Sequence, residues 1–108
     1  MTPRIGVLRR RLALEAPVDV PDGAGGVARS WNEIASVWAE VAPRRSSETV
    51  EDGRAVGLVT HRVTLRRRDD VERGVRFTDG EERYRVLTVV EGDAQRRFLD
   101  CLCEEEQP

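Results

Sequence analysis

The sequence predicts an all-β protein, a small antiparallel β-barrel of about six strands that forms one domain over residues 1–108. A chain of 108 residues can build one hydrophobic core but not two. Several short segments alternate apolar and polar residues with a period of two, and no long amphipathic helix pattern occurs. Closure into a barrel would remove exposed strand edges. Because 35% of the residues are charged and only 5% are aromatic, the core is modest and part of the stability is expected from assembly.

The first half of the chain predicts two strands. Residues 8–15 alternate leucine with charged side chains, which is typical of a half-buried strand. Residues 17–26 combine two prolines, two aspartates and three glycines, and this composition favours a long hairpin connection. Residues 37–41 alternate again and are followed by Pro43, so we expect a second strand. Trp38 and Glu40 would share one face of it, with Val37, Ala39 and Val41 on the other.

The middle of the chain predicts a long loop followed by a third strand. Residues 44–57, RRSSETVEDGRAVG, are polar and show no sustained apolar period, so we expect a mobile loop between strands two and three. Residues 61–66 alternate strictly and end before the pair Asp69 and Asp70, which predicts the third strand.

The last third of the chain predicts three more strands. Residues 75–77 and 84–90 flank the turn-forming pair Asp79-Gly80, as in a hairpin. Residues 97–103 form the last strand, and the acidic tail 104–108 is expected to fray because it has nothing to bury.

His61 and the glycine-rich stretch 23–26 are the first candidates for a catalytic or ligand-binding site. His61, the single histidine, could act as a general base, but its neighbours in sequence offer neither a nucleophile nor an orienting partner. Its alternation with Val63 and Leu65 favours a core-side or interface histidine. The glycine-rich stretch 23–26 lacks the lysine of a phosphate-binding loop, since the chain contains no lysine, and a flexible turn is the better interpretation.

Cysteines and carboxylates give no metal site. Cys101 and Cys103 lie two apart and share one face of a strand, an arrangement that does not suit a disulfide. With no further cysteine and one distant histidine, they are expected to be buried thiols. The carboxylates of 69–70 and 104–106 are interpreted as solvated charge. No cofactor is expected.

Arginine is the most prominent chemical feature. All 18 basic residues are arginine, yet the formal net charge is −2, so no global attraction to nucleic acid or to an anionic membrane is expected. The clusters 9–11, 44–45 and 66–68 would each send alternate members to opposite faces of a strand, and the aromatic residues are scattered. This favours pairing of arginine with carboxylates of neighbouring subunits or with solvent. No segment is long and apolar enough to span a membrane or to serve as a signal peptide, so synthesis in a reducing cytoplasm is expected.

Several segments in order resemble the head-tail joining proteins of tailed bacteriophages, also called head-closure or stopper proteins. The segments that carry the resemblance are LRRRL at 8–12, DGAGG at 22–26, SW at 30–31, VWAEVAP at 37–43, THRVTLR at 60–66 and FLDCLCE at 98–104. They span nearly the whole chain, and the WAEVxP and THRVT elements at this separation are more specific than either alone.

The resemblance implies a non-enzymatic β-barrel that assembles as a homo-oligomeric ring of six or twelve copies in the virion, at the head-tail interface, after synthesis in the bacterial cytoplasm. Head adaptor and portal proteins would lie above it, and a tail terminator or tail tube protein below. The ring would close the DNA exit channel and dock the tail, with at most weak, non-specific contact to packaged double-stranded DNA and no contact to a membrane.

By position, the resemblance gives the loop between strands two and three a role in the channel. The channel candidates are Arg44, Arg45, Glu48, Glu51, Asp52 and Arg54. The strand that follows supplies the ring-interface candidates Arg62, Arg66, Arg68, Asp69 and Asp70. The alternative hypothesis is a free β-barrel nucleic-acid-binding protein that uses Arg9, Arg11, Arg66 and Arg68; a third is a small hydrolase that depends on His61.

Overall fold

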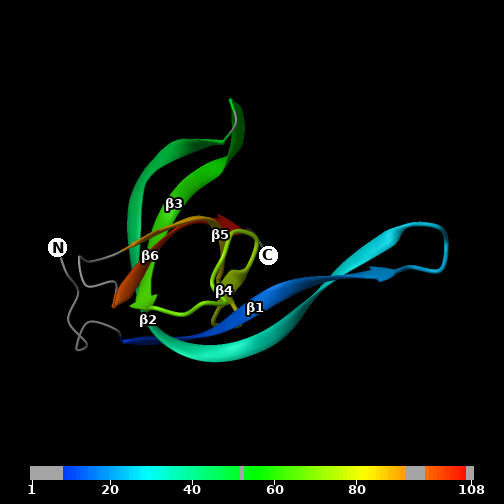
Figure 1. Ribbon diagram of the computed structural model, residues 1–108, viewed down its shortest axis with the longest axis horizontal. Helices are drawn as coiled ribbons and strands as arrows, with labels where there is room; N and C mark the ends of the chain where they lie inside the picture. Colours follow the sequence, from blue (N-terminus) through cyan, green and yellow to red (C-terminus); the bar gives the residue numbers. More distant parts are fainter. Residues whose placement is uncertain (1–8, 52, 92–96, 107–108) are drawn as a thin grey trace.

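The chain folds into a closed antiparallel β-barrel from which two long hairpins project (Figure 1). The computed structural model describes residues 9–51, 53–91 and 97–106. Around the barrel the strand order is β1-β2-β3-β6-β5-β4, and β4 pairs back onto β1. The prediction of an all-β barrel is confirmed. The strands are β1 (Arg10–Pro21), β2 (Val27–Glu51), β3 (Arg54–Arg66), β4 (Arg76–Thr78), β5 (Arg83–Glu91) and β6 (Phe98–Glu106).

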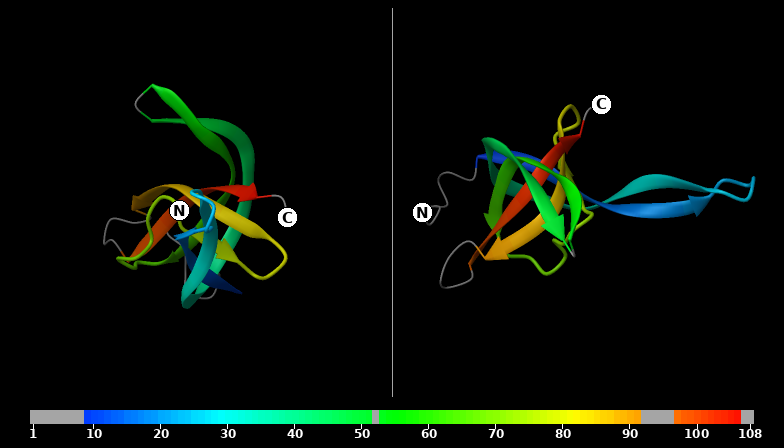
Figure 2. Two further views of the ribbon diagram at one scale, coloured as in Figure 1. Left: turned by 90° about the vertical axis from the view of Figure 1, so that its right-hand side faces the viewer. Right: turned by 90° about the horizontal axis from the view of Figure 1, so that it is seen from above.

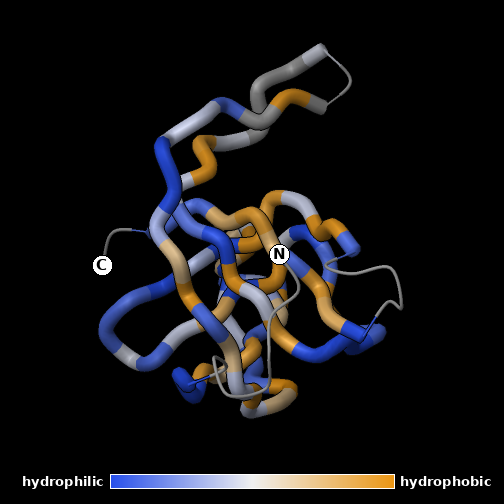
Figure 3. Tube along the Cα trace, turned by 90° about the vertical axis from the view of Figure 1, so that its left-hand side faces the viewer, coloured by the Kyte–Doolittle hydropathy of each residue, from blue (hydrophilic) through white to orange (hydrophobic). Residues whose placement is uncertain are grey.

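The core is built from the inward-facing residues of these strands, as the alternation predicts. Leu12 and Leu14 of β1 are buried, and so are Val63 and Leu65 of β3. Hydrophobic and hydrophilic positions alternate along the strands (Figure 3). Trp38 faces outward and is 53% exposed.

Strand β2 is 25 residues long and changes its pairing partner halfway. Its first half pairs with β1 up to Arg10↔Ala39, and its second half pairs with β3 from Ala39↔Leu65 onward. Each half therefore overshoots the barrel in a two-stranded hairpin. The two hairpins leave the barrel in different directions (Figures 1 and 2).

The first arm, residues 16–31 of β1 and β2, corrects the prediction of a long connection at 17–26. Pairing continues to Pro21↔Val27, and the turn is confined to five residues. The Asp22 carboxylate accepts hydrogen bonds from the backbone N–H groups of Ala24 (2.8 Å) and Gly26 (3.0 Å). These bonds hold the pKa of Asp22 below its usual value. Prolines are tolerated here because β1 pairs with β4 only up to Glu15, so beyond that point its outer edge is free.

Arg76 of β4 fixes the base of the first arm. Its Nε donates to a Glu15 carboxylate oxygen at 2.6 Å, and both side chains are largely buried. The same guanidinium lies 4.0 Å from the ring centroid of Trp31. One side chain thus joins the short closing strand to both strands of the arm.

The second arm, residues 44–58 of β2 and β3, corrects the prediction of an irregular loop. Backbone pairing runs from Ser47↔Val59 to Glu51↔Arg54, with register shifts after Pro43 and Thr49. A β-ladder satisfies backbone groups without needing a buried face, so a polar segment without an apolar period can still be a strand. The arm rests on the barrel at Gly57, where a Cβ would lie 2.8 Å from the Leu87 methyls and 2.9 Å from Glu104 Oε1.

The acidic end of the chain is paired, which corrects the prediction of a frayed tail for its first three residues. Glu104, Glu105 and Glu106 belong to β6, and Glu104 and Glu106 lie opposite Arg85 and Arg83 of β5. Arg85 Nη2 donates to Glu104 Oε1 at 3.0 Å. Opposite charges across a strand pair stabilise the sheet, so these carboxylates do not need apolar burial to be ordered. Residues 107–108 lie outside the described residues.

Loss of the Arg76 guanidinium should destabilise the closing strand and the arm base together. We expect Arg76→Ala to lower the free energy of unfolding by about 2–4 kcal/mol, because a charged hydrogen bond and a cation–π contact are lost. Urea titration followed by Trp31 fluorescence, in a Trp38→Phe background, measures this. Arg29→Ala is the control: the Arg29–Asp19 pair on the same arm is exposed, so its loss should change stability by less than about 0.5 kcal/mol. Equal losses in both variants would contradict the assignment.

A side chain at residue 57 should lift the second arm off the barrel. Valine favours strands, yet we expect Gly57→Val to cost about 1–3 kcal/mol because its methyls meet buried Leu87. Denaturant unfolding gives the value. In the double variant with Leu87→Ala, the loss should be smaller than the sum of the single losses; strict additivity would show that the two residues do not touch.

Candidate protein interaction site

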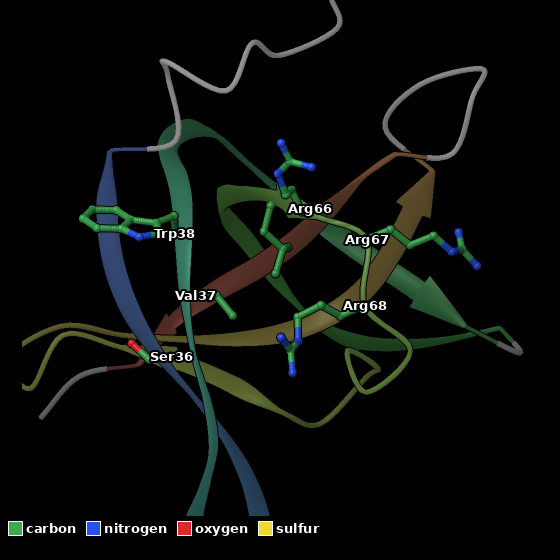
Figure 4. A pocket seen from close by; sticks show the side chains of 7 residues that line it. Ser36, Val37, Trp38, Arg66, Arg67 and Arg68 are labelled. Carbon is green, nitrogen blue, oxygen red and sulfur yellow. The ribbon is translucent and has the colours of Figure 1, made fainter.

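A groove opens where β3 separates from β2. Pairing of these strands stops at Ala39↔Leu65, so the edge of β2 before Ala39 has no neighbour on that side. The groove has a volume of about 640 Å³. Figure 4 shows the β2 residues on one side of it and three consecutive arginines on the other. Its lining residues are Ser36, Val37, Trp38, Leu65, Arg66, Arg67 and Arg68.

The β2 side of the groove combines apolar surface with an exposed aromatic ring. Buried Val37 and Leu65 form its floor. The guanidinium of Arg11 lies 5.4 Å from the centroid of the Trp38 ring, and its Nε donates to Ser36 Oγ at 2.8 Å. These contacts hold Trp38 in place while it stays open to solvent. An exposed, held aromatic ring beside arginine is typical of a protein interface.

The opposite side of the groove is cationic. Arg67 forms an ion pair with Glu91 and turns away from β2 (Figure 4). Arg68 donates two hydrogen bonds of 2.9 Å to Asp70, and this pairing holds the pKa of the Asp70 carboxyl below its usual value. Arg66 is exposed and pairs with no carboxylate among the residues described. Arg66 therefore offers a charge to a partner.

The structure brings together most of the predicted ring-interface residues. Arg66, Arg68, Asp69 and Asp70 follow one another at the end of β3 and in the connection after it, beside the groove. Arg62 lies elsewhere on the barrel wall, where its Nη2 is 3.6 Å from Glu40 Oε1. Sequence reasoning did not assign Trp38 to a site, and it named Arg11 only in the alternative nucleic-acid-binding hypothesis.

The predicted channel residues lie on the second arm. Arg44, Arg45 and Glu48 are exposed on β2. Glu51 and Arg54 end the two strands as a backbone pair, but their side chains lie outside the described residues, as does Asp52 altogether.

His61 is a packing residue, as its alternation predicts. Its ring centroid lies 4.9 Å from that of buried Tyr84, and its Nδ1 is 2.9 Å from Thr60 Oγ1 and 3.8 Å from Glu105 Oε2. Across residues 9–51, 53–91 and 97–106, no group of three or more His, Cys, Asp or Glu side chains could hold a metal ion. No helix in that part of the chain is long and apolar enough to cross a membrane.

The two cysteines are free, buried thiols, as predicted. Burial raises the pKa of Cys101 to about 12 and raises the pKa of Cys103 as well. Both thiols therefore stay protonated and covered at neutral pH, which makes them unreactive.

The chain is a closed β-barrel domain with two projecting hairpins and an apolar groove rimmed by arginine. The family model described as phage head completion protein matches residues 3–106, so the chain belongs to the phage head completion protein family. The chain is also similar to a solved chain of the virion of a native gene transfer agent particle, with 31% identity and a TM-score of 0.69. That similarity covers 98% of this chain and 99% of the other. No curated protein matches.

Family membership confirms the resemblance found in the sequence. The protein is a structural component of phage or phage-like particles, not an enzyme.

Native thiols should resist modification until the barrel opens. We expect no reaction of Cys101 or Cys103 with Ellman's reagent at pH 8, and full reaction in denaturant. A Ser36→Cys variant is the control, since its thiol in the open groove should react at once. Rapid labelling of the unmodified chain would show that the thiols are not buried.

Proposed function

We propose that this chain is the stopper subunit of a tailed phage or phage-like particle. Copies of it form a ring of six or twelve subunits under the portal and adaptor, close the DNA exit channel and dock the tail terminator or tail tube. The observation that carries the proposal is the match over nearly the full length to the family and to a chain of the gene transfer agent virion. Coverage of both chains almost end to end indicates one shared domain rather than a shared motif.

The second arm is the channel element in this proposal. It is a two-stranded ribbon seated on the barrel at Gly57, so it reaches into the channel as a formed hairpin and not as a loop that orders later. Arg44 and Arg45 carry positive charge, while Glu48 on the same strand reduces the field. Contact with DNA is therefore weak and salt-sensitive, which suits a channel that must later release DNA.

The ring contacts involve the arginine and aspartate side chains next to the groove. Arg68 and Asp70 already satisfy each other, so Arg66 and Asp69 are the better candidates for contacts between subunits. Contacts of this kind are heterologous, because a cation on one face of a subunit meets a carboxylate on another face of its neighbour.

Shortening the second arm should open the channel without unfolding the subunit. Residues 50–56 are replaced by Asn-Gly, which joins the paired residues Thr49 and Gly57 by a two-residue turn and keeps the Gly57 contact. We expect particles that contain the subunit but leak DNA or fail to accept tails. Nuclease-protected DNA and electron microscopy of purified particles measure both effects.

The control keeps the arm's length and removes charge at its tip, with Glu51→Gln and Arg54→Gln. Particles with this variant should retain DNA, because length rather than tip charge closes the channel in this proposal. Complete DNA retention and normal tails in particles with the shortened arm would rule out the channel role.

A further inference from the structure

An apolar stripe runs along β1 out of the barrel and onto the first arm. Leu12, Leu14, Ala16, Val18 and Val20 alternate along the strand and face the same way. The first two belong to the core, and Ala16 packs against it. Val18 is 40% exposed and Val20 is 45% exposed. The core-facing side of β1 therefore continues beyond the barrel, where Val18 and Val20 stay exposed among the residues that the structure describes.

The paired strand completes an uncharged face on the first arm. Ala28 lies opposite Val20, and Ser30 lies opposite Val18, so all four side chains share one face of the ribbon. The charged pair Asp19 and Arg29 lies on the other face. An isolated two-stranded ribbon with a bare apolar face is marginal in water, so this face calls for a partner.

The partner contacts the face of the arm rather than the edge of its β1 strand. Pro17 and Pro21 have no N–H group to donate to a further strand. Side-chain packing on the stripe of Val18 and Val20 is therefore favoured over pairing along the β1 edge.

The groove on the barrel complements this face in chemistry. Val37 and Leu65 offer an apolar floor, and Trp38 an exposed aromatic wall. Asp22 at the tip of the arm is exposed, and its lowered pKa keeps it ionised. Arg66 at the rim is exposed and has no carboxylate partner among the described residues, so the two charges are complementary.

The arm cannot fill the groove of its own chain. Groove and arm share strand β2: Ser36 lines the groove, and the arm's turn ends at Gly26 on the same strand. Ten residues of extended strand place the tip roughly 30 Å from Ser36, pointing away from the barrel. An arm that occupies the groove must therefore come from another molecule.

We propose that the apolar face of the first arm of one copy binds in the groove of a second copy. Val18 and Val20 pack on Val37 and Trp38 of the neighbour, and Asp22 meets its Arg66. The contact is heterologous, so its repetition generates a ring. This inference rests on the proposed ring and names the surfaces that build it.

Cross-linking inside particles tests the contact directly. The double variant Val20→Cys, Ser36→Cys is supplied in place of the natural subunit, and purified particles are treated with a short bis-maleimide. We expect a ladder of covalent oligomers, because each subunit offers one thiol on its arm and one in its groove. Either single variant should give no ladder, since the native cysteines are buried. Particles that contain the double variant but give no ladder would overturn the arm-groove contact and leave the stopper proposal standing.

Two matched substitutions on the same arm give a second, independent test. Val20 pairs with Ala28, and Val27 pairs with Pro21, so the two valines belong to neighbouring residue pairs of the arm. They lie on opposite faces, and both are exposed. Val20→Asp should lower incorporation into particles about tenfold or more, because a charge would be buried without a partner, while Val27→Asp enters normally. Normal entry of Val20→Asp, or equal loss with both, would overturn the inference. Absence of the unsubstituted subunit from all particles would instead count against the stopper proposal itself.

Discussion

The exchange of partners along β2 at Ala39 governs the shape of this protein. Within the described chain, Ala39 is the residue of β2 that pairs with both β1 and β3, and its small, fully buried side chain lets the strands meet there. A strand of 25 residues that gives each half to a different neighbour must overshoot the barrel at both ends. The arms and the groove follow from this one arrangement, because each half of β2 has one edge that pairs with no strand among the described residues.

Each arm is fixed to the barrel near its base, and the two attachments differ in kind. The first arm is held by a charged side chain, since Arg76 bridges Glu15 and Trp31. The second arm is held by the lack of a side chain, because Gly57 lets its backbone approach Leu87. A hairpin that is fixed at its base has its orientation set before assembly. Little conformational entropy then needs to be lost on binding, which favours assembly from small surfaces.

The alternation of apolar and polar residues predicts the strands of the barrel, but it does not predict the two arms. Val63 and Leu65 face the core while Arg62 and Arg66 point to the other side, and that difference gives residues 61–66 a period of two in the sequence. Residues 44–48 are exposed, so backbone pairing with the opposite strand holds this part of the arm in place and leaves no such period. The groove was missed for a related reason. Trp38 and Arg66 are far apart in sequence, and only the place where β3 leaves β2 brings them together.

Residues 17–21 show how composition can hide a pattern that carries information. Two prolines and nearby glycines indicate a turn, yet Val18 and Val20 keep the parity of Leu12 and Leu14. Pro17 and Pro21 occupy the alternate positions of the strand, and a strand tolerates proline where its outer edge makes no pairs. The prolines and the alternating valines are therefore compatible with one strand. Alternation of apolar and polar residues reflects which face of a strand is buried in the assembled protein, and that face can be exposed in the isolated chain. Apolar residues that keep facing one way beyond the barrel therefore indicate a cover supplied by another molecule, and the groove beside Trp38 has matching chemistry.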